Sequence, residues 1–283
     1  MIPDPRFIRL PKHFWANIRT ISQHVGYTAR STRQILVPTA AQIQSCMQDL
    51  GLSAAHLLNS RGRPNRLGAK ALEYFEHRAT VLNSFVEPRL MTAPAAKALF
   101  ERLQQEIPTK RAHPMNKQSK EKKSPAYFTG CINMLIEANA QGLPCDYDPR
   151  ELTTITLDGA PLRTLARRVD GAFPGPVNPI AVWEIKEYYY TTTFGSRVAD
   201  GVYETLLDGL ELEELRHQEG ISVKHYLMVD AHYTWWECGR SYLCRIVDML
   251  HMGYIDEVLF GREIEERLPT IVGEWVALAR QRA

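Results

Sequence analysis

The sequence predicts an α/β protein in which a mixed sheet flanked by helices follows an N-terminal, mainly α-helical domain. Over residues 126–283, short apolar runs alternate with longer segments of helical spacing, which indicates strands and helices in turn. Residues 1–110 carry helical spacing and turn signals. Residues 111–125 are polar, basic and without apolar periodicity, so we expect a linker or loop between the two domains.

The N-terminal domain begins with two helical segments. The first covers about residues 11–25 and is followed by a polar, basic stretch. The second follows Thr39, which is a suitable N-cap, and ends at Gly51.

A further helical pair is expected after this point. Ser53 would cap a short helix through Leu58, and a longer helix would run from about residue 69 to 85. Residues 59–68 form a basic turn between them. This order resembles a helix-turn-helix unit, although helical pairs also occur where helices only pack together.

The C-terminal domain is expected to begin with a helix at residues 126–141. A meander of three strands follows in the sequence runs "TTITLDG", "LRTLARRVDGAF" and "IAVWEIKEYY". Helices and strands then alternate to the end, in the order helix 196–218, strand 224–231, helix 239–253, strand 256–261 and helix 262–280. The result is a mixed α/β arrangement around one sheet.

Composition and motifs exclude several classes of protein. The chain has an ordinary globular composition, with 45% hydrophobic and 23% charged residues. No apolar run reaches the length of a membrane span, and the proline-broken N-terminus is not a secretory signal. The five cysteines form no C-x-x-C pair, so we expect free thiols and a cytoplasmic protein. Walker, G-x-S-x-G and dinucleotide glycine motifs are missing, which argues against NTPases, serine hydrolases and Rossmann oxidoreductases.

Charge is divided unevenly along the chain. Residues 1–125 carry a net charge of +12 and residues 126–283 a net charge of −10. A basic surface attracts polyanions, of which nucleic acid is the commonest, although a solvated basic surface is an equal alternative. An acidic domain that acts on DNA needs a metal cation between its carboxylates and the phosphates.

The strand at residues 180–189 carries charges inside an apolar run. Successive side chains of a strand alternate between faces. Glu184 and Lys186 therefore share one face, and Trp183 and Ile185 share the other. If the preceding strand pairs through the "PGPVNP" turn, Asp170 comes beside Glu184. Two adjacent carboxylates are costly unless a cation lies between them, and oxygen ligands of this kind suit Mg²⁺.

This pattern resembles the core motif of the PD-(D/E)xK nuclease superfamily. Asp170 is separated by thirteen residues from Glu184, and Lys186 follows after one more residue. The order of helix, meander, helix, strand and helix over residues 126–283 is also similar to that of type II restriction endonucleases. One departure is Val169, which stands where the family often has a proline.

The resemblance implies a restriction-endonuclease-like fold and Mg²⁺-dependent, sequence-specific hydrolysis of double-stranded DNA, as in restriction or phage defence. Asp170 and Glu184 would be metal ligands with the backbone carbonyl of Ile185. Lys186 would orient the attacking water or stabilise charge. Glu137 resembles the extra acidic residue that some members use near the metal, and a solvated helix glutamate is the alternative.

Further residues are expected to contact DNA. Ser196 and Arg197 begin the helix after the charged strand, where backbone N–H groups and an arginine suit a phosphate. The basic turn adds three arginines, a residue type that suits phosphates and guanine edges: Arg61, Arg63 and Arg66. Glu187 points away from Glu184 on an ideal strand and is expected to be a salt-bridge or solvent residue.

One centre per chain and two DNA strands to cut predict at least a homodimer. Surplus aromatic side chains could supply part of its interface: Trp235, Trp236, Tyr242 and Tyr254. For the two tryptophans a place in the core is the first expectation. A monomer that nicks one strand is the alternative. A non-catalytic helix-turn-helix regulator with a degenerate nuclease fold is the second hypothesis for function.

Overall fold

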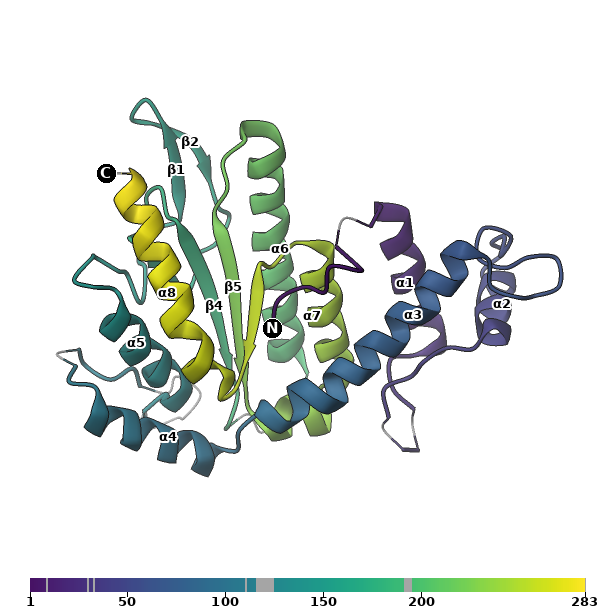
Figure 1. Cartoon of the computed structure of the whole chain (residues 1–283), viewed down its shortest axis with the longest axis horizontal. Helices are drawn as coiled ribbons and strands as arrows, with labels where there is room; N and C mark the ends of the chain where they lie inside the picture. The colour runs from purple at the N-terminus through teal and green to yellow at the C-terminus, as the bar shows by residue number, and fades with distance from the viewer. Residues whose placement is uncertain are drawn as a thin grey trace.

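The computed structural model shows a mixed α/β architecture with an elongated helical extension (Figure 1). It describes residues 1–8, 10–29, 31–32, 34–109, 111–115, 125–190 and 195–282. The central part of the expected linker, residues 116–124, lies outside them. Within the described residues, no helix combines the length and apolar character needed to cross a membrane.

The main sheet has four strands and is mixed, as predicted. Its spatial order is β3 (Gly171–Phe173), β4 (Ala181–Glu187), β5 (Lys224–Asp230) and β6 (Glu257–Phe260). β4, β5 and β6 are parallel, and β3 pairs with β4 in the antiparallel direction at one edge. The last two strands and the charged strand were all expected from their apolar runs.

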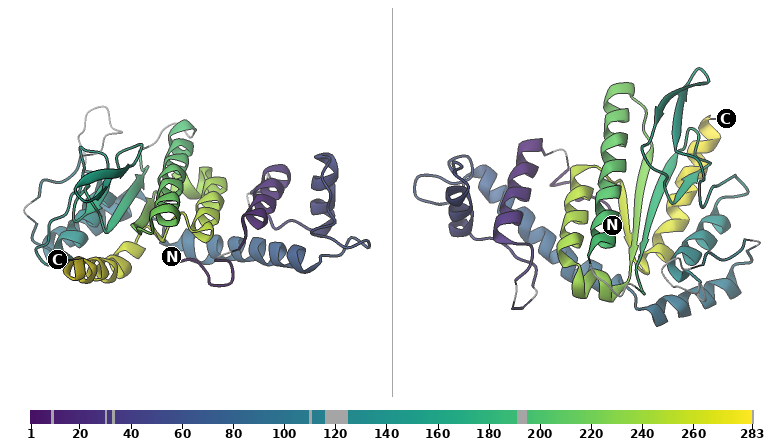
Figure 2. Two further views of the ribbon diagram at one scale, coloured as in Figure 1. Left: turned by 90° about the horizontal axis from the view of Figure 1, so that it is seen from above. Right: turned by 180° about the vertical axis from the view of Figure 1, so that it is seen from behind.

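Helices cover both faces of this sheet (Figure 2). On one face lie α5 (Tyr127–Asn139) and α8 (Glu263–Arg282), with α4 (Ala93–Glu106) packed against α5. On the other face lie α6 (Ser196–Glu219) and α7 (Arg240–Met252). The helices expected from periodicity in this domain are therefore present, whereas α4 was not expected.

The predicted three-strand meander is wrong for its first two members. β1 (Thr154–Leu157) and β2 (Ala160–Thr164) form a separate two-stranded sheet. The run "LRTLARRVDGAF", expected as one strand, is broken because residues 165–170 leave β2 and turn before β3 begins. This turn, with its two arginines, brings Asp170 to the edge of the main sheet.

The N-terminal part consists of three helices and a terminal turn. α1 (Lys12–Val25) and α2 (Ala40–Asp49) occur where they were predicted, and Thr39 forms a capping box with the third residue of the helix. α3 (Arg66–Val81) continues into a π-helical turn, Leu82–Val86. A 3₁₀ turn, Glu87–Arg89, precedes α4.

The short helix expected from Ser53 to Leu58 is not formed. The N–H groups of Leu57 and Leu58 both donate to the carbonyl of Ala54, which closes a single turn. The N–H of Asn65 bonds to the carbonyl of Leu57, so the turn is held against the start of α3 instead of extending. The predicted helix-turn-helix order is therefore absent from residues 40–81.

The packing places the change of domain earlier than the basic stretch. Met91 and the apolar side of α4 belong to the core formed with α5, α8 and the sheet. Residues 86–90 thus join the two parts, and α3 leads from beside α7 to the far end of the molecule (Figures 1 and 2). Trp235 and Trp236 are buried in the chain's own core, as first expected, and Tyr254 is buried there too, so these three side chains are not free to form an interface.

A buried ion pair joins α3 to α7. The guanidinium of Arg78 lies 3.0 Å from both carboxylate oxygens of Asp248, and neither side chain is appreciably exposed. Tyr74 donates its hydroxyl to the same carboxylate at 2.6 Å, and Arg78 also donates to Ser22 of α1. Buried polar groups therefore hold α1, α3 and α7 together.

We expect Asp248→Leu to lower the free energy of unfolding by about 3–5 kcal/mol, because Arg78 would remain charged in an apolar environment. Adding Arg78→Met should restore much of this loss, since neither charge is then buried alone. Urea denaturation measures both values. Asp49→Asn, which removes the exposed pair with His24, is the control and should cost less than about 1 kcal/mol. Additive losses in the double variant would contradict the coupling.

Candidate functional site

The register of β3 and β4 places two acidic residues side by side. Gly171 pairs with Trp183, so Asp170 comes opposite Glu184. A Cβ atom on residue 171 would lie 2.1 Å from the Trp183 indole, which in turn stacks on Trp275 at 5.4 Å. The N–H of Asp170 donates to the carbonyl of Trp183 at 3.1 Å and to Glu184 Oε1 at 3.3 Å. The glycine therefore allows the close strand contact that brings the carboxylates together.

Glu184 is fully buried and is neutralised from two directions. Its Oε2 accepts from Lys186 Nζ at 2.7 Å, and its Oε1 lies 2.8 Å from the Arg167 guanidinium. Burial opposes ionisation of Glu184, but Lys186 and Arg167 outweigh it and hold its pKa below the usual value. Burial likewise opposes the charge on Lys186, but Glu184 and Asp170 raise its pKa. Glu184 and Lys186 are therefore both charged and form a buried ion pair.

Helix α6 completes this cluster. Gly201 lies against the aliphatic stem of Lys186, since a Cβ there would be 3.1 Å from its Cδ. Lys186 Nζ reaches Glu204 at 3.1 Å, and Arg167 reaches Asp208 at 2.6 Å. Burial and the charge of Glu184 raise the pKa of Asp208 to about 7.

Sequence reasoning missed three members of the cluster. Glu204 and Asp208 are four residues apart on α6, a spacing that places both on one helix face. That spacing was the available signal, together with the arginine at position 167 close before Asp170.

Asp170 lies at the boundary between this cluster and a cavity on the α5 side. Its Oδ2 accepts from the N–H of Ile185 at 2.8 Å, whereas no hydrogen bond from a described residue reaches Oδ1. Within a strand the N–H and C=O of one residue point to the same side, so the carbonyl of Ile185 also faces this edge. Burial, followed by the charge of Glu184, raises the pKa of Asp170 to about 6. A cation bound next to Asp170 would stabilise the ionised form of its carboxylate, because an opposite charge favours the charged form.

The cavity has a volume of about 320 Å³, and oxygen-bearing side chains form part of its lining. Glu187 Oε2 accepts from both the N–H and the hydroxyl of Thr129, at 3.0 and 2.9 Å. Glu187 is therefore half-buried and bonded to α5, and its expected role as a salt-bridge residue stays a prediction. The side-chain oxygen of Asn133 is buried and has no hydrogen-bond partner among the described residues. Asp170 and Ile185 line the same space.

Glu137 makes contacts outside this cluster. It accepts from the Thr109 hydroxyl and lies 3.7 Å from Arg111 Nε. The structure gives it no contact with Asp170 or Glu184 among the described residues. The alternative, a solvated helix glutamate, agrees with its partial exposure, although residues 109 and 111 also contact it.

The predicted DNA-contacting residues fall in two places. Ser196 and Arg197 are exposed on the first turn of α6, the helix that also carries Glu204. The three arginines of the basic turn are exposed at the far end of the extension, near the start of α3 (Figure 1): Arg61, Arg63 and Arg66. No carboxylate of a described residue lies within 4.0 Å of these three guanidinium groups.

The available donors fit a hard cation better than a soft one. The described residues contain no group of three or more His, Cys, Asp or Glu side chains placed to hold a metal ion. Asp170, Ile185 and Asn133 line one cavity, and Glu184 lies beside Asp170 without lining it. An all-oxygen set with open positions is the environment that Mg²⁺ prefers.

Another buried carboxylate, Asp230, lies at the end of β5, opposite Glu187. Asp230 pairs in register with Glu187, accepts from the N–H of Met91 at 2.7 Å and is bonded by the hydroxyl of Tyr189. Burial raises its pKa to about 7 in spite of these donors.

We expect this carboxyl to make stability fall as pH rises. The unfolded chain releases the proton near pH 4 and the folded chain near pH 7, so the folded state binds more protons between these values. The free energy of unfolding should decrease across this window by up to about 4 kcal/mol from Asp230. Asp230→Asn should flatten that part of the profile in urea denaturation at several pH values. An unchanged profile would show that the carboxyl is ionised throughout.

Comparisons with known proteins give families without an assigned activity. Residues 1–85 match the family described as "Domain of unknown function (DUF7690)", and residues 91–275 match the family described as "Domain of unknown function (DUF7687)". The gap between the two matches coincides with the turns that join α3 to α4. Searches of curated proteins and of solved structures found no match. Since the second match covers more than half of its length, the chain belongs to the DUF7687 family.

Proposed function

We propose that this protein is a Mg²⁺-dependent endonuclease of restriction or defence type that hydrolyses double-stranded DNA at specific sequences. The observation that carries the proposal is the position of Asp170. Its carboxylate stands beside Glu184 at a sheet edge, one of its oxygens has no hydrogen-bond partner among the described residues, and the residue lines a cavity. Lys186 is bound to the same glutamate.

The chain's own residues would divide the work of phosphodiester hydrolysis. Asp170, Glu184 and the Ile185 carbonyl would hold the metal ion, which supplies Lewis acidity and lowers the pKa of a bound water. Lys186 is kept protonated by its buried partners and so can stabilise negative charge developing on a phosphate. Arg167 balances the carboxylates of α6 and keeps Glu184 in position.

Binding of DNA would use the exposed basic groups. The basic turn, called the arginine turn below, lies at the far end of the helical extension and offers three guanidinium groups without carboxylate partners among the described residues. The start of α6 offers Ser196 and Arg197, which follow Lys186 closely along the chain. One centre per chain favours a homodimer, so that each strand of a two-fold site meets one centre.

A second candidate function rests on a specific observation. Both oxygens of Glu184 are already bonded, to Lys186 and to Arg167, so the cluster is electrically satisfied as it stands. Such a network also suits a DNA-binding protein whose nuclease-like fold has only a structural role. The two functions differ in whether DNA is cut when Mg²⁺ is present.

We expect plasmid or phage DNA to be cut in Mg²⁺ and to remain intact in EDTA. Asp170→Asn should abolish cutting, because it removes ligand charge without changing shape, while DNA binding is retained or tightened. Gel analysis of the products and a binding assay on the same samples measure both. A dimer acting on both strands gives linear product, and a monomer gives nicked circles.

The control for this variant is Asp200→Asn, an equivalent change at an exposed position on α6. It should cut like the unaltered protein. Thermal unfolding of each variant shows that loss of cutting is not loss of fold. Binding of DNA without cutting by the unaltered protein would favour the second function, and cutting by Asp170→Asn at the normal rate would exclude this site.

The arginine turn gives an independent prediction. Replacing Arg61, Arg63 and Arg66 together by alanine should weaken DNA binding and make its salt dependence shallower by up to about three phosphate contacts. Filter binding at several salt concentrations gives the slope. A control triple change at exposed lysine and arginine positions outside the turn, Lys12, Lys97 and Arg150, removes the same charge. Equal slopes for both triple variants would mean that the turn contributes only general charge.

A further inference from the structure

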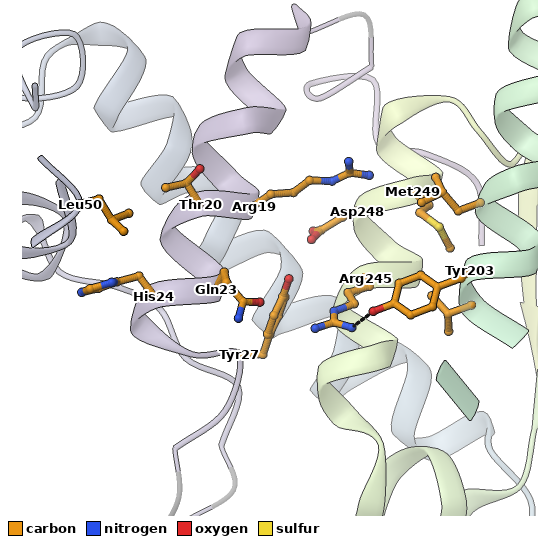
Figure 3. Close-up of a pocket in the computed structure, with 12 residues that line it drawn as sticks. Arg19, Thr20, Gln23, His24, Tyr27, Leu50, Tyr203, Arg245, Asp248 and Met249 are labelled. Carbon is orange, nitrogen blue, oxygen red and sulfur yellow. Dashed lines mark hydrogen bonds between the residues drawn. The ribbon is translucent and has the colours of Figure 1, made fainter. Parts of the chain in front are cut away.

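A second cavity lies away from the Asp170 site. It has a volume of about 620 Å³ and is bounded by α1 on one side and by α6 and α7 on the other (Figure 3). It is therefore formed by both family segments of the chain. A cavity of this size is in the range that holds a small organic ligand.

The cavity carries positive charge that the protein does not balance. Arg19 and Arg245 line it, and no carboxylate of a described residue lies within 4.0 Å of either guanidinium. Asp248 is the one carboxylate in the described lining, and it is held by Arg78 behind the wall. An anion would thus meet two cations without displacing an existing ion pair.

Tyrosine rings surround one of these arginines. Arg245 donates to the hydroxyl of Tyr203 at 2.9 Å, and its guanidinium carbon lies 5.1 Å from the centre of the Tyr27 ring (Figure 3). The aromatic side chain of Tyr203 is 52% exposed in spite of this bond. Tyr203 is therefore available to a flat ligand, whereas the guanidinium groups of Arg245 and Arg78 already lie over the Tyr27 ring.

The remaining walls are of two kinds. An apolar side is formed by α6 and α7 through Val202, Leu206 and Met249. A polar side is formed by α1 through Thr20 and Gln23, which can donate and accept hydrogen bonds. A bare anion would leave the apolar side unfilled, and a purely apolar ligand would leave the charges of Arg19 and Arg245 unbalanced.

We propose that this cavity binds a nucleotide, with the base against Tyr203 and the apolar side and the phosphate on Arg19 and Arg245. Aromatic stacking and arginine forks are the usual means of holding these two parts. The nucleotide comes either from solution or from a DNA strand, and the chemistry of recognition is the same. The proposal does not depend on DNA cleavage at Asp170.

Calorimetry on the full chain with AMP, dAMP, adenosine and inorganic phosphate tests the free-nucleotide source. We expect the two nucleotides to bind more tightly than adenosine or phosphate alone. Arg245→Ala should weaken nucleotide binding about tenfold or more through loss of a charged contact, and Tyr203→Ala should weaken it through loss of stacking. Tyr233→Ala, at another exposed tyrosine outside this cavity, is the control and should not change it.

DNA that carries a fluorescent adenine analogue tests the strand source. An increase in fluorescence on binding that is lost in Tyr203→Ala and suppressed by AMP would place a nucleotide of the strand in the cavity. Thermal unfolding shows that both variants are folded, and Arg245→Lys keeps the charge if the alanine variant is unstable. Two results would overturn the proposal: binding unaffected by either variant, or neither nucleotide binding nor a fluorescence change that depends on Tyr203.

Discussion

The burial of Glu184 is the constraint on which the rest of the C-terminal domain depends. A carboxylate in the middle of a central strand loses its hydration, and the cost is recovered only if cations and donors surround it. Lys186 from the same strand, Arg167 from the preceding turn and the backbone of Asp170 meet this need. The path of residues 165–170, which interrupts the expected strand, is what delivers two of these three groups.

The same physical solution holds the N-terminal part in place. Arg78 and Asp248 are both buried, and each would be strongly destabilising alone. Because Tyr74 and Ser22 bond to this pair as well, α1, α3 and α7 must adopt one relative position to satisfy all four groups. Polar matching therefore fixes how the helical extension meets the α/β domain, and with it the cavity between α1 and α6.

Periodicity predicted most of the elements because it reports on burial, which is local to each segment. The main-sheet strands β4, β5 and β6 and the helices that cover them follow from apolar spacing alone. The helix after Ser53 failed because a bond from Asn65 to Leu57 holds a single turn, and that partner lies in the next element. The placement of β1 and β2 in the main sheet was wrong because pairing with a neighbour, and not a strand's own residues, decides which sheet a strand joins.

The candidate site was predictable in part for the same reason. Strand alternation places Glu184 with Lys186, and one turn brings in Asp170, so a single hairpin contains the information. Glu204 and Asp208 arrive from a helix that begins beyond the strand, and Asn133 from a helix far earlier in the chain. Glu187 shows what strand alternation cannot predict. Alternation gives the face to which a side chain points, but not the hydrogen-bond donor that it meets on that face, here Thr129.

Helix α3 has a consequence for distance along DNA. Its sixteen residues span about 24 Å, and the arginine turn is attached to its outer end. At about 3.4 Å for each base step, this length corresponds to roughly seven base pairs. If the arginine turn contacts bases and the Asp170 site cleaves the backbone, α3 sets the distance between these two positions on DNA. Lengthening α3 by whole turns would then shift the cleavage position relative to the recognised sequence.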